Sequence, residues 1–204
     1  MSDRDLAALV AHEDIVRLRA ALDLHDAVGA EREEGFRRAA VVLLFRAGED
    51  GSPELLFIKR ADYPGDPWSG QVAFPGGREE PGDSALVETG IRETREETGI
   101  DLSRDGTIIG TLDDLRPTTL GLPAIIVRPY VALLDLCDPL ILSPEVALAF
   151  WIPLELLKVA ESWRDTIIFA RGIQANRRAF HHEDHIIWGM TERILAQLLE
   201  LLAK

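Results

Sequence analysis

The sequence predicts an α/β protein in which layers of sheet are covered by helices. Apolar residues with helical spacing occur at the start, near the middle and at the end of the chain, and short apolar runs typical of strands lie between them. Elements in this mixed order can bury their apolar faces against one another. At 204 residues the chain is long enough for one substantial domain, and a second domain is not required.

The composition excludes some classes of partner. Hydrophobic residues at 47% and charged residues at 28% match an ordinary globular protein. The net charge of −13 argues against nucleic acid as the main partner, because binding its backbone calls for a basic surface. No run of about 18 uncharged apolar residues occurs, so no transmembrane helix is expected. The first residues mix acidic and basic side chains without the apolar core of a signal peptide, which predicts a cytoplasmic protein.

The chain begins with a predicted helical extension. Residues 3–22 repeat apolar side chains at helical spacing, and Ser2 is available as the N-cap. The apolar set is Leu6, Leu9, Val10, Ile15, Leu18 and Leu22. Residues 23–37 are mostly charged and small, which indicates a connection. We therefore divide the chain into an N-terminal helical extension, residues 1–37, and a main domain, residues 38–204.

The main domain opens with a predicted hairpin. Residues 39–46 and 54–60 are apolar runs on either side of an Asp50-Gly51 turn signal. The first run is continuously apolar, which indicates a strand buried on both faces. A third strand is predicted over residues 71–75, after a loop that contains Pro64, Gly65, Asp66 and Pro67.

Further strands are expected in the second half of the chain, over residues 107–115, 124–134, 147–154 and 165–170. Pro129 predicts an edge position or a bulge for its strand, because proline has no N–H to donate. The chain closes with a helix whose apolar face is formed by Ile187, Met190, Ile194, Leu198, Leu201 and Leu202.

The stretch from residue 76 to 100 predicts one helix with an unusual density of carboxylates. On a helical wheel Glu93, Glu96 and Glu97 gather on one arc, beside an apolar arc, while Glu88, Arg92 and Arg95 point away from both. Like charges at these spacings repel by about 0.2–0.5 kcal/mol per pair, which suggests that a cation sits among them. Carboxylate oxygens without Cys or His favour a hard ion such as Mg²⁺. The alternative is a solvated acidic face with ordinary Arg pairs.

Flanking residues define the ends of this helix. Residues 75–77, Pro-Gly-Gly, predict a turn that cannot continue a strand, and Asp83 or Ser84 can cap the N-terminus. Gly99 follows the last helical residue, where a left-handed conformation is common. Gly90 lies within the apolar arc at a cost of about 1 kcal/mol relative to Ala. We expect it to allow a close approach between the helix and a sheet.

The segment from Gly77 to Ile100 resembles the Nudix box, whose pattern is a Gly, five residues, Glu, seven residues, and then Arg-Glu-apolar-x-Glu-Glu-x-Gly-apolar. The matching residues here are Gly77, Asp83 in place of the first Glu, Arg92, Glu93, Glu96, Glu97, Gly99 and Ile100. Eight residues separate Asp83 from Arg92 where the family has seven, and Thr94 takes an apolar position. The resemblance implies an α/β/α sandwich with a mixed sheet, and hydrolysis of a diphosphate bond.

The resemblance also implies roles for individual residues. Glu93, Glu96 and Glu97 are expected to bind the metal, with Gly77 or Gly76 adding a backbone carbonyl. Arg92 is expected to orient a glutamate through an ion pair. Outside the helix, Glu145 matches the position from which some relatives supply the general base, although after Pro144 it could instead cap a helix.

Other polar residues are weaker candidates. Arg60 and Arg78 flank the FPGG segment and are expected to bind substrate phosphates, ahead of Lys59, Arg116 and Arg128. The HHEDH segment, residues 181–185, lacks the spacing of a known metal motif and predicts a solvated turn before the last helix. Cys137 follows a leucine in an apolar-rich stretch and is expected to be a buried thiol.

Two longer segments are similar to the coenzyme A pyrophosphatase branch of the family. They are LFIKRADYPGDPWSGQVAFPGGREEPGD and HIIWGMTERIL, and the resemblance covers most of residues 38–202. In that branch an Arg and a His usually follow the LLxxR portion, where coenzyme A is recognised. Residues 64–68, from Pro64 to Trp68, replace them here.

The leading hypothesis is a Mg²⁺- or Mn²⁺-dependent diphosphatase that cleaves coenzyme A or its thioesters to 3′,5′-ADP and 4′-phosphopantetheine products. The first alternative substrates are ADP-ribose, nucleotide sugars and dinucleotides. The second alternative is a non-catalytic binding or regulatory module of the same fold, which commonly loses the glutamates that this chain retains. Neither nucleic acid nor a membrane is an expected partner, and family relatives suggest a homodimer.

Overall fold

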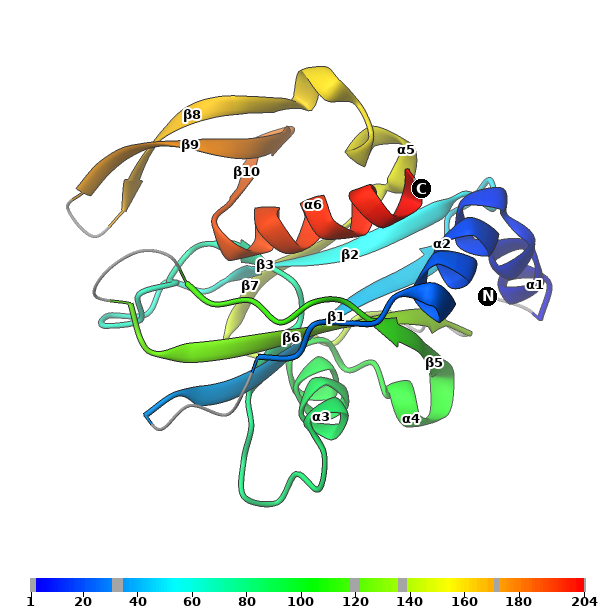
Figure 1. Cartoon of the computed structure of the whole chain (residues 1–204), viewed down its shortest axis with the longest axis horizontal. Coiled ribbons are helices and arrows are strands. Elements are labelled where there is room, and N and C mark those ends of the chain that lie inside the picture. The colour runs from blue at the N-terminus through cyan, green and yellow to red at the C-terminus, as the bar shows by residue number, and fades with distance from the viewer. Residues whose placement is uncertain (1–2, 31–34, 118–121, 136–138, 171–172, 204) are drawn as a thin grey trace.

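The computed structural model describes residues 3–30, 35–117, 122–135, 139–170 and 173–203. Its main sheet is mixed and has the strand order β3-β2-β1-β6-β5, with β4 paired to β1 and β7 paired to β2 (Figure 1). Only β1 and β6 run parallel among the pairs described for this sheet. The strands are β1 (Arg37–Ala47), β2 (Pro53–Arg60), β3 (Val72–Ala73), β4 (Gly76–Arg78), β5 (Gly106–Thr111), β6 (Ile125–Leu134) and β7 (Val146–Pro153).

Helices cover both faces of the main sheet, as the sequence predicts for an α/β/α sandwich. Helices α3 (Leu86–Thr98) and α4 (Leu102–Asp105) lie below the sheet in Figure 1, and α6 (Met190–Leu202) lies above it. Strand β1 shows how the two layers are separated. Its residues Leu43 and Phe45 belong to the core on the α6 side, whereas Val42 and Leu44 belong to the core on the other side. The predicted burial of this strand on both faces is confirmed.

The predicted hairpin is also confirmed, but the prediction that residues 75–77 cannot continue a strand is wrong. Strands β1 and β2 pair antiparallel around residues 48–52. The Gly76-Gly77 segment does continue as a strand, since β4 pairs antiparallel with β1. Gly76 has φ +150°, and a Cβ on it would lie 2.2 Å from the Ala40 carbonyl oxygen. Glycine therefore permits a backbone conformation and an approach that other residues would not.

The edge position predicted for Pro129 is wrong, because β6 lies between β1 and β5. The Pro129 carbonyl accepts a hydrogen bond from Leu112 N–H at 3.0 Å. Opposed antiparallel residues normally exchange two bonds, and proline cannot donate the second. The Leu112 carbonyl instead accepts a bond from Thr111 Oγ1 at 3.0 Å. A neighbouring hydroxyl thus compensates for proline in a central strand. The other predicted alternative, a bulge, has a counterpart nearby, because the pairing of β5 with β6 shifts register between residues 108 and 110 of β5.

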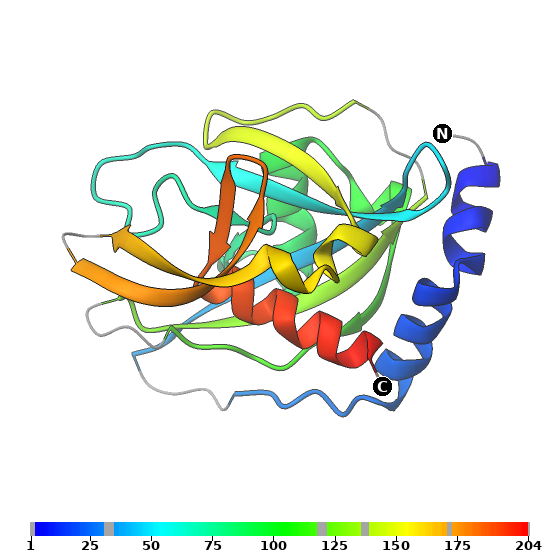
Figure 2. The ribbon, with the colours of Figure 1, turned by 90° about the horizontal axis from the view of Figure 1, so that it is seen from above.

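The N-terminal extension contains two helices instead of one. Helices α1 (Asp3–Ala11) and α2 (Glu13–Leu24) meet at His12, whose ring nitrogen accepts a bond from Asp14 N–H. Figure 2 shows them stacked along one end of the sheet. Leu9, Leu18 and Leu22 are buried in the same core as α6. The predicted cap Ser2 lies outside the described residues.

The last part of the chain forms a second, three-stranded sheet above α6. It follows α5 (Leu154–Leu157) and the 3₁₀ turn Ala160–Ser162, and consists of β8 (Trp163–Ala170), β9 (Ile173–His182) and β10 (His185–Trp188). Strand β8 confirms the prediction for residues 165–170, and Ile187 belongs to β10, not to the last helix. Within the described residues no helix is both long and apolar enough to span a membrane.

The close approach of α3 to the sheet predicts a packing effect at Gly90. A Cβ there would lie 3.0 Å from Val42 Cγ2 and 3.5 Å from Ala40 Cβ. Leu is a better helix former than Gly by about 0.8 kcal/mol, so Gly90→Leu would stabilise a helix that had free space around it. We expect it instead to destabilise the fold by about 2 kcal/mol through overpacking, measured by urea unfolding.

Two companion variants separate the close packing at residue 90 from the general effect of replacing glycine by leucine. Gly82 has no neighbouring atom within 4 Å of its Cβ position, so Gly82→Leu should change stability by less than about 0.5 kcal/mol. Adding Val42→Ala to Gly90→Leu should recover part of the loss, because the two side chains compete for one space. If Gly90→Leu were as stable as the parent, the space between α3 and the sheet would be large enough for a leucine side chain, and the overpacking prediction would be wrong.

Candidate active site

Helix α3 begins later than the capping residues suggest. Its N-cap is Ala85, without a side-chain cap, and it ends at Gly99, whose φ of +78° confirms the predicted left-handed C-cap. The two predicted caps, Asp83 and Ser84, make other hydrogen bonds. Ser84 donates its N–H to the Glu88 carboxylate, and Asp83 faces the middle of the helix instead of its end.

Asp83 and Arg92 form the ion pair that fixes the acidic face of α3. The guanidinium donates from Nε to Asp83 Oδ1 and from Nη2 to Asp83 Oδ2, both at 3.1 Å. Asp83 Oδ2 also accepts bonds from Thr89 Oγ1 and from Glu80 N–H. Bonding to Arg92 holds the pKa of Asp83 well below its usual range and raises that of Arg92. Arg92 also bonds Glu93 and Glu96, so the helical-wheel prediction that it points away from the glutamates is wrong, whereas the ion pair to a glutamate that the family resemblance implies is present.

Arg92 also connects to two of the three box glutamates. Its Nη1 donates to Glu93 Oε1 at 3.0 Å and to Glu96 Oε2 at 3.4 Å, and its Nη2 donates to the Arg78 carbonyl at 3.0 Å. Glu93 is half-buried, and its side chain is less exposed (19%) than that of Glu96 (59%). One cation held by Asp83 thus fixes the position of both glutamates and of the strand β4 backbone.

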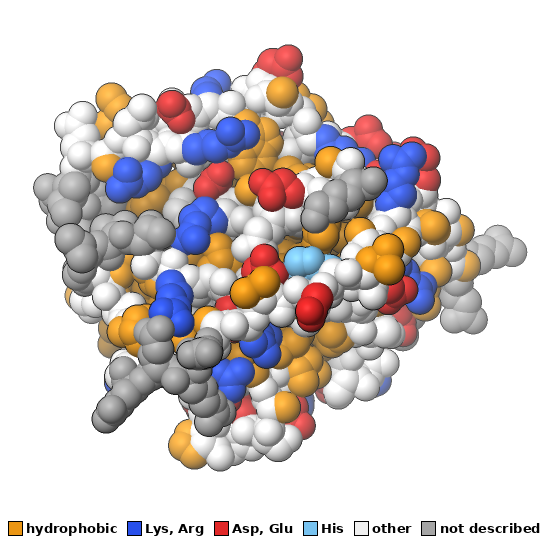
Figure 3. All heavy atoms as spheres, viewed as in Figure 1, with side chains coloured by type: hydrophobic (Ala, Val, Ile, Leu, Met, Phe, Trp, Pro, Cys, Tyr) orange, Lys and Arg blue, Asp and Glu red, His pale blue; other side chains and the backbone are white. Residues whose placement is uncertain are grey.

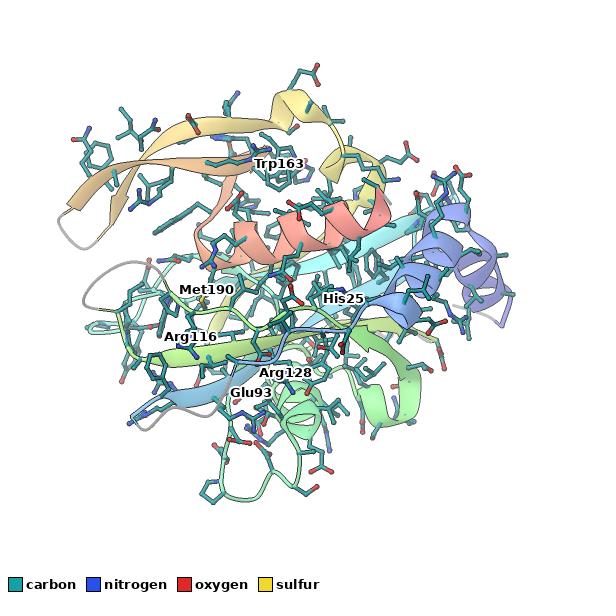
Figure 4. All side chains as sticks on the ribbon, viewed as in Figure 1. His25, Glu93, Arg116, Arg128, Trp163 and Met190 are labelled. Carbon is teal, nitrogen blue, oxygen red and sulfur yellow. The ribbon has the colours of Figure 1, made fainter. Side chains whose placement is uncertain are left out.

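Gly77 leaves room for the Glu93 carboxylate. A Cβ on Gly77 would lie 2.4 Å from Glu93 Cδ and Oε1, inside van der Waals contact. Figure 4 shows Glu93 below the sheet, beside α3. Burial raises the pKa of Glu93, although the Arg92 hydrogen bond opposes this effect. Because residue 77 has no side chain, the Glu93 carboxylate can lie directly against its backbone. The charge of this carboxylate is only partly neutralised by Arg92.

Glu97 is the most buried member of the acidic face. Its side chain is 5% exposed, and Oε2 accepts the Gly76 N–H at 2.9 Å. Arg60 Nη1 lies 4.0 Å from Glu97 Oε1. Burial raises the pKa of Glu97 to about 7, against the opposing effects of the Gly76 hydrogen bond and the Arg60 charge. A buried carboxylate without a close cation is costly in its charged form.

Glu145 approaches this site from another element. It directly precedes β7, so the alternative in which it caps a helix is wrong. Its carbonyl accepts the Ala61 N–H at 2.8 Å, and nearby Ser143 donates its N–H to the Glu97 carbonyl at 3.1 Å. The charge of Glu145 contributes to the raised pKa values of Glu93 and Glu97. Residues 143–145 are thus bonded to the end of α3 and bring an exposed carboxylate to the box.

These residues fit a divalent cation as a partial shell. Two desolvated carboxylates with raised pKa values would be stabilised by a positive charge, and the space left by the missing side chain of Gly77 accommodates one of them. Among the residues that the structure describes, no three His, Cys, Asp or Glu side chains form a complete metal-binding group. Mg²⁺ commonly takes one or two protein carboxylates and completes its shell with water and phosphate, so a complete protein cage is not required.

The predicted phosphate-binding residues have different surroundings. Arg60 donates from Nε and Nη2 to Asp66 Oδ2, at 3.2 and 2.9 Å, so it is already paired. Arg78 is exposed at the end of β4. Arg128 makes two bonds to Asp114, and Arg116 lies over the ring of Phe36. In the view of Figure 4, Arg116 is labelled to the left of α3, and Arg128 is labelled above α3.

Two of the remaining predictions concern other parts of the chain. In the HHEDH segment, His181 and His182 end β9 and His185 begins β10, so the predicted turn is present but joins two strands. Cys137 lies outside the described residues. On the face drawn in Figure 3, basic and acidic side chains are interspersed and form no continuous basic stripe among the residues that are coloured.

The sequence reasoning missed the roles of Asp83 and Asp66. Asp83 has the spacing of an N-cap, and its true partner, Arg92, is nine residues away in the sequence. The signal that could have identified it is its position in the family pattern, where it stands in place of the first Glu. Asp66 lies in a Pro- and Gly-rich loop, where no periodicity indicates its partner.

Comparisons with known proteins identify the family of this chain. The model of the NUDIX domain family matches residues 35–170. A protein of Yersinia pestis (strain Pestoides F), named "Uncharacterized Nudix hydrolase NudL", is 33% identical over 165 residues, which cover 80% of this chain and 79% of that protein. A protein of the same name from Yersinia pseudotuberculosis (serotype O:1b, strain IP 31758) gives the same values. The crystal structure of a MutT/nudix family protein from Enterococcus faecalis matches with a TM-score of 0.57 and 15% identity, covering 100% of this chain and 75% of that one, which supports the fold.

The Asp83–Arg92 pair predicts a pH-dependent contribution to stability. The folded-state pKa of Asp83 is lowered, so its stabilising effect is present above its unfolded pKa, about 3.9, and is lost as the pH falls below that value. We expect Asp83→Asn to lower the free energy of unfolding by about 2 kcal/mol at pH 7. The difference from the parent should shrink between pH 5 and pH 3, measured by urea unfolding in metal-free buffer.

The matched control is a solvent-exposed Arg–carboxylate pair within α2. Glu13→Gln removes the partner of Arg17, where both side chains are more than 60% exposed, and should cost less than about 0.5 kcal/mol. A deficit of Asp83→Asn that stayed constant from pH 7 to pH 3 would show that the ion pair is not its cause.

Proposed function

Because this chain belongs to the Nudix family of hydrolases, we propose that it uses Mg²⁺ or Mn²⁺ to hydrolyse the diphosphate bond of a nucleoside diphosphate-linked compound. The observation that supports this most directly is that Glu93 and Glu97 are both desolvated and both feel the negative charge of Glu145. Their mutual repulsion and burial create a demand for positive charge. Divalent cations would supply that charge and would at the same time neutralise the anionic diphosphate.

In this proposal Glu93, Glu96 and Glu97 hold the metal, with the Gly77 carbonyl as a further ligand. A divalent cation bound to them would neutralise the diphosphate oxygens and lower the pKa of an attacking water. Arg92 acts through the glutamates, since its guanidinium is fully engaged with Asp83, Glu93 and Glu96. It fixes their side chains in advance, which reduces the entropy lost when the substrate binds.

Glu145 is the proposed general base. Its side chain is exposed, whereas Glu97 is buried, so water has access to Glu145. Its backbone is held on one side by Ala61 and follows Ser143, which is bonded to the end of α3. A carboxylate on a segment anchored in this way can accept a proton from water beside the metal-binding glutamates.

Coenzyme A or its thioesters are the first proposed substrate, with 3′,5′-ADP and 4′-phosphopantetheine products. The support is the SGQVAFPGG segment and the C-terminal IWG helix segment, which resemble that branch. Arg78 is the proposed phosphate-binding residue, and Arg60 is the second candidate. A specific observation favours the alternative group of ADP-ribose, nucleotide sugars and dinucleotides. The loop after β2 carries Asp62 and Asp66, and Asp66 already occupies Arg60, so the loop offers little positive charge to a 3′-phosphate.

Three further proposals complete this function. The extension of residues 1–37 and the hydrolase domain of residues 38–204 share one core, so we propose that the extension supports the domain instead of acting alone. A homodimer and a cytoplasmic location are proposed from the family resemblance and the composition. The competing class, a non-catalytic binding or regulatory module, is disfavoured because all three box glutamates are retained.

The metal-binding glutamates predict a loss of turnover without a loss of fold. We expect Glu97→Gln and Glu96→Gln each to reduce kcat by at least about 100-fold, which corresponds to about 2.7 kcal/mol in the barrier. The melting temperature should change little, because Gln at residue 97 keeps an acceptor for the Gly76 N–H and removes a buried charge. Turnover, circular dichroism and thermal unfolding are the measurements.

Glu88→Gln is the matched control on the same helix. Glu88 is exposed and bonded to Ser84, away from the glutamate cluster, and its variant should keep the parental kcat. Parental turnover in Glu97→Gln, or a parallel loss of folding and activity, would make these glutamates structural and contradict the metal assignment.

The substrate proposal predicts a ranking of kcat/KM. We expect coenzyme A to exceed ADP-ribose, a nucleotide sugar and a dinucleotide when each is assayed with Mg²⁺ and with Mn²⁺. If coenzyme A is cleaved ten times less efficiently than one of these, a deficit of about 1.4 kcal/mol, the alternative group holds. The diphosphatase proposal would survive that result.

A further inference from the structure

We propose that Asp66 is a positioning residue which holds the Arg60 guanidinium away from Glu97 and thereby keeps that carboxylate available to a divalent cation. The inference rests on the proposed function, because it assumes that Glu97 binds metal. It adds a residue outside the Nudix box to the control of the metal site.

The geometry shows one cation shared unequally between two anions. Arg60 makes two hydrogen bonds to Asp66 Oδ2, at 3.2 and 2.9 Å, through Nε and Nη2. The remaining nitrogen, Nη1, lies 4.0 Å from Glu97 Oε1, too far for a hydrogen bond. The side chains of Asp66 (16% exposed) and Glu97 (5% exposed) are both poorly solvated, so the position of the guanidinium matters for both.

The backbone fixes both ends of this arrangement. Arg60 is the last residue of β2, and its N–H donates to the Gln71 carbonyl at 3.0 Å. Asp66 is held by its own loop, because Oδ1 accepts the Trp68 N–H at 3.1 Å and its N–H donates to the Tyr63 carbonyl at 3.2 Å. The Asp66 carboxylate is therefore placed by a turn, and the flexible Arg60 side chain is drawn to it.

Without the charge of Asp66, Glu97 would be the nearest described anion to the guanidinium. A movement of about 1 Å would bring Nη1 into hydrogen-bond range of Glu97. An arginine bonded there would compete with a divalent cation for the same carboxylate oxygen, and buried ion pairs with good geometry are difficult to displace. Loss of the Asp66 charge should therefore weaken metal binding, although Asp66 itself touches no metal.

This arrangement also joins the loop of residues 61–71 to the metal site. The turn that places Asp66 determines how strongly Arg60 is held. A change in the loop conformation would therefore alter the distance between the Arg60 guanidinium and the Glu97 carboxylate. A substrate that contacts this loop would alter the affinity for metal by the same route, and by linkage the metal would alter the affinity for substrate.

The test uses Mn²⁺ binding to the full chain without substrate, measured by electron paramagnetic resonance. In Asp66→Asn, Oδ1 can still accept the Trp68 N–H, while an amide replaces the oxygen that binds Arg60. We expect the Kd for Mn²⁺ to rise at least five-fold, and Asp66→Glu to recover part of the loss. Asp62→Asn is the control, because Asp62 lies in the same loop and bonds Ser69 instead of an arginine. It should leave the Kd unchanged.

A double-mutant cycle identifies Arg60 as the intermediary. In an Arg60→Gln background no guanidinium is left to move, so adding Asp66→Asn should leave the Kd for Mn²⁺ unchanged. An equal weakening by Asp66→Asn in both backgrounds, or no weakening in the parent, would overturn the inference. Glu97→Gln distinguishes this failure from a failure of the proposed function. If Glu97→Gln binds Mn²⁺ as the parent does, the metal assignment itself is wrong.

Discussion

The burial of carboxylates between α3 and the sheet is the constraint on which this structure depends. Charged oxygens removed from water need hydrogen-bond donors or cations. Arg92 serves both Asp83 and Glu93 in this way, because its guanidinium donates to each of the two carboxylates. Glu97 receives a single backbone N–H and a distant Arg60, so its demand for charge is incompletely met. The glycine-rich strand, the turn before α3 and the segment before β7 all serve to place these few groups.

Much of the fold follows from local patterns that the sequence displays. The β1–β2 hairpin has a turn signal between two apolar runs, and the continuously apolar β1 reports burial on both faces. The features that were missed depend on contacts between distant residues. Pro129 occupies a central strand because a threonine hydroxyl replaces its missing donor, and β4 exists because Gly76 adopts a positive φ. Strand β9 was missed since its mainly polar sequence lacks the apolar alternation on which strand prediction relies, and the short strand β10 was missed because its Ile187 continues the helical spacing of the last helix.

In the candidate site too, local features could be predicted from the sequence and contacts between distant residues could not. The spacing of Glu93, Glu96 and Glu97 along a helix is a local property, so the acidic face could be predicted from sequence. The partners that set its electrostatics could not be read from periodicity, because Asp83, Arg60 and Asp66 come from a turn, a strand end and a loop. Arg60 illustrates the difference. Its place before the FPGG segment suggests a phosphate-binding residue, whereas the structure shows it already bonded to a carboxylate.

Gly76 combines two roles that are usually separate. Its missing side chain lets β4 pair with β1, and its amide proton points at the Glu97 carboxylate. Hydrogen bonding to a charged oxygen draws electron density from an amide proton, so the nuclear magnetic resonance of this one proton would report the charge on Glu97. The chain therefore carries a natural spectroscopic probe of its own acidic centre, one that requires no label beyond ¹⁵N and cannot be moved without disturbing the sheet.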